Sequence, residues 1–114
     1  MSKSKTLNFT KIYKEKILSG KKSSTVRLRT TLKRGEVVDI IVGGERIGKA
    51  KILNVKKLSL KDLTNKDAVR DGFKDKKSLL KALKRHYSNI TEDSTVYFIS
   101  FNILEGQRSI DQQS

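Results

Sequence analysis

The stretch ILSGKKSSTVRLR, residues 17–29, contains the sharpest change of pattern in the sequence. Apolar residues recur at helical spacing before Gly20, whereas polar and apolar residues alternate after it, as in a half-buried strand. Glycine at such a junction suits the left-handed backbone position just beyond a helix. The stretch therefore predicts a helix, a turn and a strand. The residues that share the polar face of that strand are Ser23, Thr25, Arg27 and Arg29.

Regular patterns continue on both sides of this stretch. Upstream, residues 8–20 predict one opening helix with Phe9 and Ile12 on its apolar face. Downstream, the glycine pair at 43–44 indicates a hairpin, and Gly48 indicates a bend or bulge in the next strand. The other expected elements are strands at 37–42, 46–60 and 94–104 and helices at 64–72 and 76–87. This order predicts an α+β fold, most simply a curled sheet or barrel flanked by helices.

The later elements carry their own signals. Thr64 and Asp67 have the spacing of a capping box, and Gly72 suits the end of the same helix. In the following helix, leucines at helical spacing form a stripe that faces a core. The last strand is rich in β-branched and aromatic residues, so both of its faces are expected to be covered.

Composition limits the class of protein. The 114 residues fit one domain, which we expect to span residues 1–104, followed by a polar, frayed tail at 105–114. With no cysteine and a single histidine, His86, the sequence predicts no disulfide, no bound metal and no cofactor. No apolar run reaches membrane-spanning length and the N-terminus lacks a signal-peptide core, so we expect a cytoplasmic protein.

Positive charge is concentrated in the first half of the chain. There are 26 Lys and Arg against 12 Asp and Glu, and residues 1–57 hold 16 of the former and 4 of the latter. The net charge of +14 therefore lies almost entirely in that half. A cationic face of this kind favours polyanions as partners, through phosphate neutralisation and counterion release. A lysine-rich surface that serves solubility is the alternative.

The order of the sequence blocks resembles the ASCH domain family. The blocks are ILSGKKSSTVRLR, RGEVVDIIVGG, LKDLTNKDAVRDGF, LKRHY and VYFISF, between about Phe9 and Phe101. The most specific element is the pattern Gly-x-Lys-x-x-Thr-x-Arg, here Gly20, Lys22, Thr25 and Arg27. The resemblance implies a PUA-like β-barrel or curled sheet of about five or six strands, flanked by an N-terminal helix and two helices before the last strand. It also implies RNA binding in a cleft between barrel and helices.

The resemblance also implies candidate catalytic residues. A bacterial branch of the family removes the acetyl group from N4-acetylcytidine with a lysine, a threonine and a glutamate. The lysine and threonine match Lys22 and Thr25, and the spacing after DLT places the third position on Asp71, which is one methylene shorter than glutamate. If the protein is an enzyme, these three residues are the candidates. Some relatives cut RNA, so a metal-dependent ribonuclease is a further alternative.

The same residues can be judged by their chemistry. Threonine is a weak nucleophile that needs a base, and Lys22 can serve as one only if burial or neighbouring cations lower its pKa. A carboxylate partner such as Asp71 raises a lysine pKa, so the sign depends on which effect is larger. In a regular strand Lys22 and Thr25 would face opposite sides. We therefore expect Lys22 in the turn after Gly20, or a β-bulge between the two residues.

Cations and aromatic rings are candidate ligands for a nucleic acid. The candidates are Lys21, Lys22, Arg27, Arg29, Lys49, Lys51 and Tyr87. Guanidinium groups bind phosphate or stack on bases, and lysines suit phosphate contacts without sequence preference. Tyr13, Phe73 and Tyr97 are expected mostly in the core, whereas Tyr87 is expected to be partly exposed at a helix end, where it can stack on a base.

These observations predict a monomeric domain that binds RNA, or another single-stranded nucleic acid and possibly DNA, in a basic cleft that accepts a nucleotide. Three alternatives stay open. They are an amidohydrolase of acylated cytidine, a metal-dependent ribonuclease, and a protein-interaction module whose positive charge is incidental.

Overall fold

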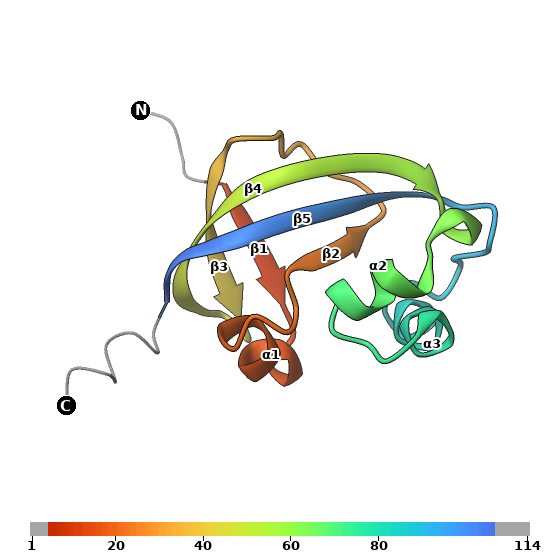
Figure 1. The fold of residues 1–114 in the computed structure, drawn as a ribbon, viewed down its shortest axis with the longest axis horizontal. Coiled ribbons are helices and arrows are strands. Elements are labelled where there is room, and N and C mark those ends of the chain that lie inside the picture. The colour runs from red at the N-terminus through yellow and green to blue at the C-terminus, as the bar shows by residue number, and fades with distance from the viewer. Residues whose placement is uncertain (1–4, 107–114) are drawn as a thin grey trace.

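The computed structural model describes residues 5–106, which form one curved sheet with helices packed against it (Figure 1). The strands are β1 (Thr6–Phe9), β2 (Ser24–Arg27), β3 (Val37–Val42), β4 (Glu45–Ser59) and β5 (Thr95–Gly106). The helices are α1 (Lys14–Leu18), α2 (Asn65–Arg70) and α3 (Lys76–His86), with the short 3-10 helices η1 (Lys11–Tyr13) and η2 (Leu60–Asp62). The predicted α+β fold, a curled sheet or barrel flanked by helices, is confirmed, and the sheet is a five-stranded half barrel.

The sheet curls because its central strands are interrupted by bulges. The strand order is β1-β3-β4-β5-β2, and β4 and β5 run side by side along most of their lengths (Figure 1). Between β3 and β4, Ile40 pairs with Gly48 and Ile41 with Arg46, so Ile47 is an extra residue. The bend predicted at Gly48 therefore falls at the adjacent position. Bulges of this kind bend a strand and increase its twist.

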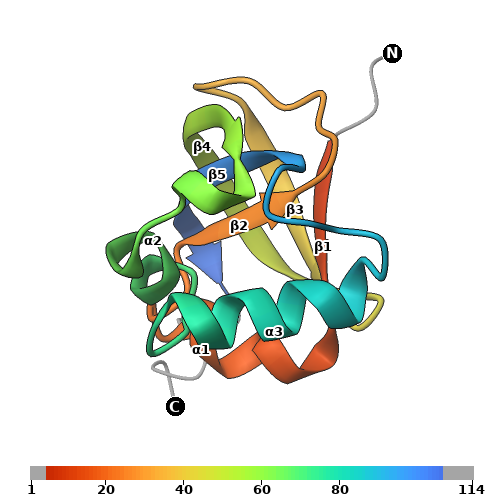
Figure 2. The ribbon, with the colours of Figure 1, turned by 90° about the vertical axis from the view of Figure 1, so that its right-hand side faces the viewer.

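The strand β5 contributes to both hydrophobic clusters of the fold. Ile99 and Phe101 pack into the interior of the half barrel with residues of β1, β3 and β4. Val96 and Phe98 lie in the second cluster with residues of α2 and α3, and Figure 2 shows α3 lying across the open end of the half barrel, close to α1. The expectation that both faces of this strand are covered is confirmed.

The opening segment is not the single helix predicted for residues 8–20. Residues Thr6–Phe9 form β1, which pairs in parallel with β3 and buries Leu7 and Phe9. The chain turns at Thr10, and only η1 and the five-residue α1 are helical. Ile12, expected on the apolar face, is 74% exposed. The helical spacing was misleading because Phe9 reaches the core from a short strand, whose pairing with β3 is a tertiary contact.

The two later helices begin and end as the sequence predicts. Thr64 caps α2 in a complete capping box with Asp67, and Gly72 follows with φ of +93°. In α3, Leu79 and Leu83 are buried. Within residues 5–106, no helix is long and apolar enough to cross a membrane.

The end of β5 bears on the expected boundary at residue 104. The strand continues to Gly106, two residues into the segment predicted to be a tail. The rest of that segment, 107–114, lies outside the described residues.

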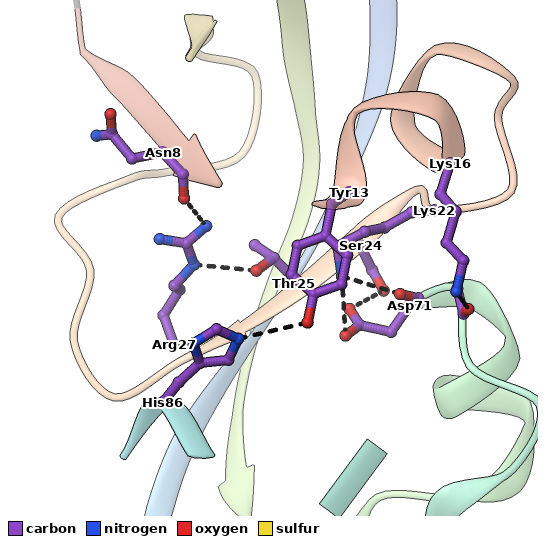
Figure 3. Close-up of polar contacts among 10 residues, drawn as sticks. Asn8, Tyr13, Lys16, Lys22, Ser24, Thr25, Arg27, Asp71 and His86 are labelled. Atoms are coloured by element: carbon purple, nitrogen blue, oxygen red, sulfur yellow. Dashed lines mark hydrogen bonds and ion pairs between the residues drawn. The ribbon is translucent and has the colours of Figure 1, made fainter. Parts of the chain in front are cut away.

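Arg27 joins the two edge strands of the half barrel. Its Nη2 donates to the backbone oxygen of Asn8 on β1 at 2.6 Å, and its Nε donates to Oγ1 of Thr25 at 2.9 Å (Figure 3). The guanidinium carbon also lies 5.0 Å from the centre of the Phe9 ring, in cation–π range. β1 and β2 are the two edge strands of the sheet, and this side chain of β2 connects them where they do not pair with each other.

Replacing Arg27 with methionine is expected to destabilise the fold by about 1–3 kcal/mol, because it removes a charged hydrogen bond across the seam and a cation–π contact. Urea unfolding at neutral pH measures the change. Arg29→Met is the matched control, since Arg29 is exposed beyond the end of β2 and is expected to change stability by less than about 0.5 kcal/mol. Equal effects of the two substitutions would show that Arg27 does not hold the seam.

Candidate functional site

A cavity of about 260 Å³ lies where β1 and β2 approach α3. Its walls are partly apolar, from the second hydrophobic cluster, and partly polar. The polar and aromatic residues that line it are Asn8, Phe9, Thr10, Tyr13, Lys22, Thr25, Arg27, Asp71, Phe73, His86 and Tyr87. Figure 3 shows how several of these side chains converge from β2, η1 and the ends of α2 and α3, with the backbone oxygen of Asn8 on β1 beside them. The cavity is the one place where most of the predicted site residues meet.

Lys22 lies in the turn between α1 and β2, and its side chain is only 4% exposed. Gly20 turns the chain with φ of +83°, and the backbone N–H of Lys22 donates to the Lys16 oxygen at 2.9 Å. A side chain at Gly72 would place its Cβ 3.2 Å from the Lys22 Cβ, so glycine there allows the close approach. Because Lys22 precedes the strand, it can line the same cavity as Thr25.

The Lys22 ammonium group forms a buried ion pair with Asp71. Nζ lies 3.1 Å from Oδ2 of Asp71 and also donates to the Asp71 backbone oxygen at 2.9 Å. The second carboxylate oxygen accepts a 2.8 Å hydrogen bond from the hydroxyl of Ser24, which is fully buried on β2 (Figure 3). The shorter aspartate side chain therefore reaches the lysine, because it extends from the residue that ends α2.

Aromatic rings surround the same ammonium group. Nζ of Lys22 lies 4.9 Å from the centre of the Tyr13 ring, 5.5 Å from that of Phe73 and 5.9 Å from that of Phe9. The negative faces of aromatic rings attract a cation, and they also exclude water from it. The lysine thus has its charge partner on one side and an apolar enclosure around it.

Burial shifts the pKa of both members of the pair. Desolvation lowers the pKa of Lys22 and outweighs the attraction of Asp71, while the nearby cations Arg27 and Lys16 lower it further. Desolvation also raises the pKa of Asp71, against the effect of Lys22 and of the hydrogen bond from Ser24. The two pKa values therefore move toward each other, which favours an uncharged lysine more than an exposed pair would. The direction of the Lys22 pKa shift, which the sequence left open, is therefore downward, because desolvation is the larger effect.

Thr25 and Arg27 share one face of β2, as the alternation predicts. Thr25 is 5% exposed, and its hydroxyl oxygen accepts the hydrogen bond from Arg27 Nε. A cationic donor stabilises negative charge on that oxygen. The arrangement places a buried hydroxyl, a guanidinium group and a lysine of lowered pKa around one cavity.

The other predicted ligands are divided between cavity and surface. Tyr87 lines the cavity and is partly exposed. The residues that are exposed and do not line the cavity are Lys21, Arg29, Lys49 and Lys51. On β4 the two lysines alternate with buried residues and therefore point away from the core. Contacts of these four cations with phosphate remain predictions.

Several residues that line the cavity were not assigned to it from the sequence, among them three with aromatic rings. Tyr13 and Phe73, expected in the core, are partly buried and face the cavity, with ring centres 6.2 Å apart. His86 ends α3, and its Nε2 lies 3.4 Å from the Tyr13 hydroxyl. The only sequence signal was their position, in the opening segment or next to a helix end, and their convergence follows from the packing of α3 beside η1.

Within residues 5–106, no three His, Asp or Glu side chains gather closely enough to hold a metal ion.

The fold and the cavity define a PUA-like domain, a curled half barrel with helices across its open end. The family model of the ASCH domain matches residues 3–105, and the chain belongs to the ASCH domain family. The resemblance carried by the sequence blocks is thereby confirmed. Comparison with curated proteins gives no match.

Solved structures of other proteins share this fold. Protein EF3133 from Enterococcus faecalis V583 is similar with a TM-score of 0.69 and 12% identity, covering 91% of this chain and 83% of its own. The ASCH domain from Lactobacillus crispatus JV V101 has a TM-score of 0.65 and 17% identity, over 84% of this chain and 79% of that one. The hypothetical protein PH0355 has a TM-score of 0.66 and 22% identity, over 87% and 99%. At these identities the likeness concerns the fold.

The ion pair yields a test of its energetic role. Asp71→Ala is expected to cost about 3–5 kcal/mol of unfolding free energy, because it leaves a buried ammonium group without its carboxylate. The double variant Lys22→Met/Asp71→Ala is expected to recover most of that loss, since neither buried charge remains. Urea unfolding of the wild type and both variants measures this. A double variant as unstable as the single one would contradict the expected cost of the unpaired charge.

Proposed function

We propose that this ASCH domain binds RNA, or single-stranded nucleic acid more broadly, with one nucleotide in the cavity. ASCH domains are thought to bind RNA. The observation that carries the proposal is a cavity lined by both aromatic rings and hydrogen-bonding groups, within a chain of net charge +14. Unstacked bases are typically bound between aromatic side chains and hydrogen-bonded at their edges. At about 260 Å³ the cavity is below the roughly 300–1,000 Å³ of pockets for drug-sized ligands, which suits a single nucleotide unit.

A cationic flank, formed by Lys16, Lys81 and Arg85, adjoins the cavity. It supports a single-stranded nucleic acid as the ligand, in place of a free nucleotide. These residues line a second hollow of about 320 Å³, which shares Tyr13 and Phe73 with the cavity. The helix α3 contains five Lys and Arg and no Asp or Glu between its first and last residues. A phosphate that follows a nucleotide in the cavity would meet this flank, where counterion release favours binding.

Removing cations from the flank tests this proposal. Lys81→Ala/Arg85→Ala is expected to weaken binding to a short single-stranded RNA about tenfold and to reduce the slope of log affinity against log salt by about 1.4, because two phosphate contacts are lost. Fluorescence anisotropy over a salt series measures both quantities.

The matched control is Lys66→Ala/Arg70→Ala, which removes the same charges from exposed positions of α2. It is expected to leave the slope nearly unchanged. Lys49→Ala/Lys51→Ala tests in the same assay whether the outer face of β4 also contacts phosphate. Undetectable or salt-insensitive binding of wild type to RNA and DNA would overturn the proposal and favour a protein-interaction module, and shortened RNA on a gel would point to a nuclease.

A second candidate, an amidohydrolase of acylated cytidine, is favoured by the lowered pKa of buried Lys22 beside Thr25. In this reaction uncharged Lys22 accepts the Thr25 hydroxyl proton as Oγ1 attacks the acyl carbon. Lys22 then returns the proton to the leaving amine, so that cytidine departs and an acyl–threonine ester remains. Water hydrolyses the ester to a carboxylic acid and restores the threonine. Asp71 orients the lysine.

Incubation with N4-acetylcytidine, followed by chromatography for cytidine and acetate, tests this candidate. Wild-type turnover is expected to fall by at least about a hundredfold in Lys22→Met, because the base is removed. Thr25→Val, which keeps the shape of the side chain without its hydroxyl, is expected to lose activity similarly. No turnover by the wild type, or equal turnover by Lys22→Met, would remove the candidate while leaving RNA binding intact.

A further inference from the structure

The free edge of β2 borders the cavity. Residues from both faces of this strand line it, Thr25 and Arg27 from one face and Val26 from the other. Successive side chains of a strand point to opposite faces of the sheet. A single cavity can therefore contact residues of both faces only where it lies beside the edge of the strand. β2 is the last strand in the sheet order, so no strand of residues 5–106 pairs with this edge.

The pairing register shows which peptide groups of β2 face outward. The Phe101 N–H donates to the Ser23 oxygen at 2.9 Å, and Val26 stands opposite Phe98 in the same antiparallel register. Hydrogen-bonded and non-hydrogen-bonded pairs alternate along antiparallel strands. Thr25, two residues after Ser23, therefore turns its peptide groups toward β5. Val26 turns its N–H and C=O away from β5, toward the cavity.

The peptide groups of β1 also alternate between facing their neighbour and facing outward, and here a hydrogen bond shows the outward direction directly. The Asp39 N–H donates to the Lys5 oxygen, and the Gly43 N–H donates to the Phe9 oxygen, so alternate residues of β1 bond to β3. Asn8 lies between the bonded positions, and its peptide groups face outward. The hydrogen bond from Arg27 to the Asn8 oxygen confirms that direction. Arg27 therefore donates its hydrogen bond to the β1 edge and not to β2. The outward N–H and C=O of Val26 can still bond to a ligand.

We infer that the cavity binds the hydrogen-bonding edge of a nucleobase through the backbone N–H and C=O of Val26, an inference that rests on the proposed function. Val26 is 4% exposed, and buried peptide groups require partners. The Watson–Crick edge of each nucleobase presents an acceptor beside a donor, which matches one outward-facing strand residue. The base completes the sheet edge in place of a further strand.

The site favours a base over a peptide strand as the occupant. An added peptide strand pairs along several alternate residues of an edge, whereas β2 has four residues and its neighbouring outward residue, Ser24, is fully buried. The cavity is closed on the far side by Leu79, Ala82 and Leu83 of α3.

Nuclear magnetic resonance with free nucleosides tests the inference in the unmodified protein. Cytidine is expected to shift the amide resonance of Val26 more than those of Thr25 and Arg27, whose N–H groups face β5. N3-methylcytidine, which carries a methyl group on the binding edge, is expected to bind about tenfold more weakly, because both edge hydrogen bonds are lost. Uridine and N3-methyluridine are expected to behave in the same way.

Val26→Pro removes the outward N–H without removing a bond of the ladder, and proline is tolerated at such edge positions. Val26→Ala is the matched control, because it trims the side chain and keeps the N–H. The proline variant is expected to bind cytidine several-fold more weakly than the alanine variant, with the same salt slope for RNA. If the proline variant does not fold, the wild-type comparison of methylated and unmethylated nucleosides decides.

The possible outcomes separate this inference from the proposed function. RNA binding with a normal salt slope, but no shift at Val26 and no effect of edge methylation, would overturn the inference and keep the function. Absence of all RNA and nucleoside binding would overturn both. A shift at Val26 caused by an extended peptide and not by nucleosides would identify a strand-binding edge and would also overturn the inference.

Discussion

The burial of the Lys22 ammonium group against Asp71 is the constraint on which the architecture of the site depends. The contact joins the turn after Gly20 to the end of α2, and Ser24 ties the same carboxylate to β2. Well-packed apolar residues stabilise a core as well as a buried ion pair does, or better. A fold that keeps this pair therefore bears a desolvation cost, and such costs are concentrated at sites of chemistry or recognition. A Cβ at Gly72 would lie only 3.2 Å from the Lys22 Cβ, and the φ of +93° disfavours other residues there, so the close approach depends on the glycine backbone.

The half barrel leaves a seam between β1 and β2, and the cavity occupies it. Exposed strand edges attract other strands, and proteins normally cover or interrupt them. Here Arg27 satisfies the Asn8 oxygen on one edge, and α3 with His86 covers the other side. The uncovered remainder is small, polar and enclosed by rings. The same incomplete closure that limits the sheet thus creates a place for a ligand that can form the hydrogen bonds of an absent strand.

The sequence was sufficient for most elements because their signals were local. The capping box of α2, the glycine turns and the alternation in β2 depend on residues a few positions apart. The strand containing Phe9 was missed because four residues give little alternation and its pairing partner is distant. At the site, Lys22 and Asp71 were found through the family pattern, whereas Tyr13 and His86 were missed because their approach is set by how α3 packs on the sheet. The exposure of Arg29 depends on the end of β2 at Arg27, and that of Lys49 and Lys51 depends on which face of β4 packs on the core. Neither could be read from local sequence.

The distribution of charge separates the sources of affinity and selectivity. Lys81, Lys84 and Arg85 of α3 are exposed, where they can neutralise phosphate without distinguishing one base from another. The cation of Lys22 is instead enclosed and paired, so it adds little to the external field and much to the polarity of the cavity. Selectivity must then come from the enclosed groups, since only a ligand that enters the seam can meet them. On the function we propose, a base in the cavity would also satisfy the peptide groups of the β2 edge, whereas a base stacked outside would gain phosphate contacts alone. This difference would favour unpaired bases over those held in a duplex.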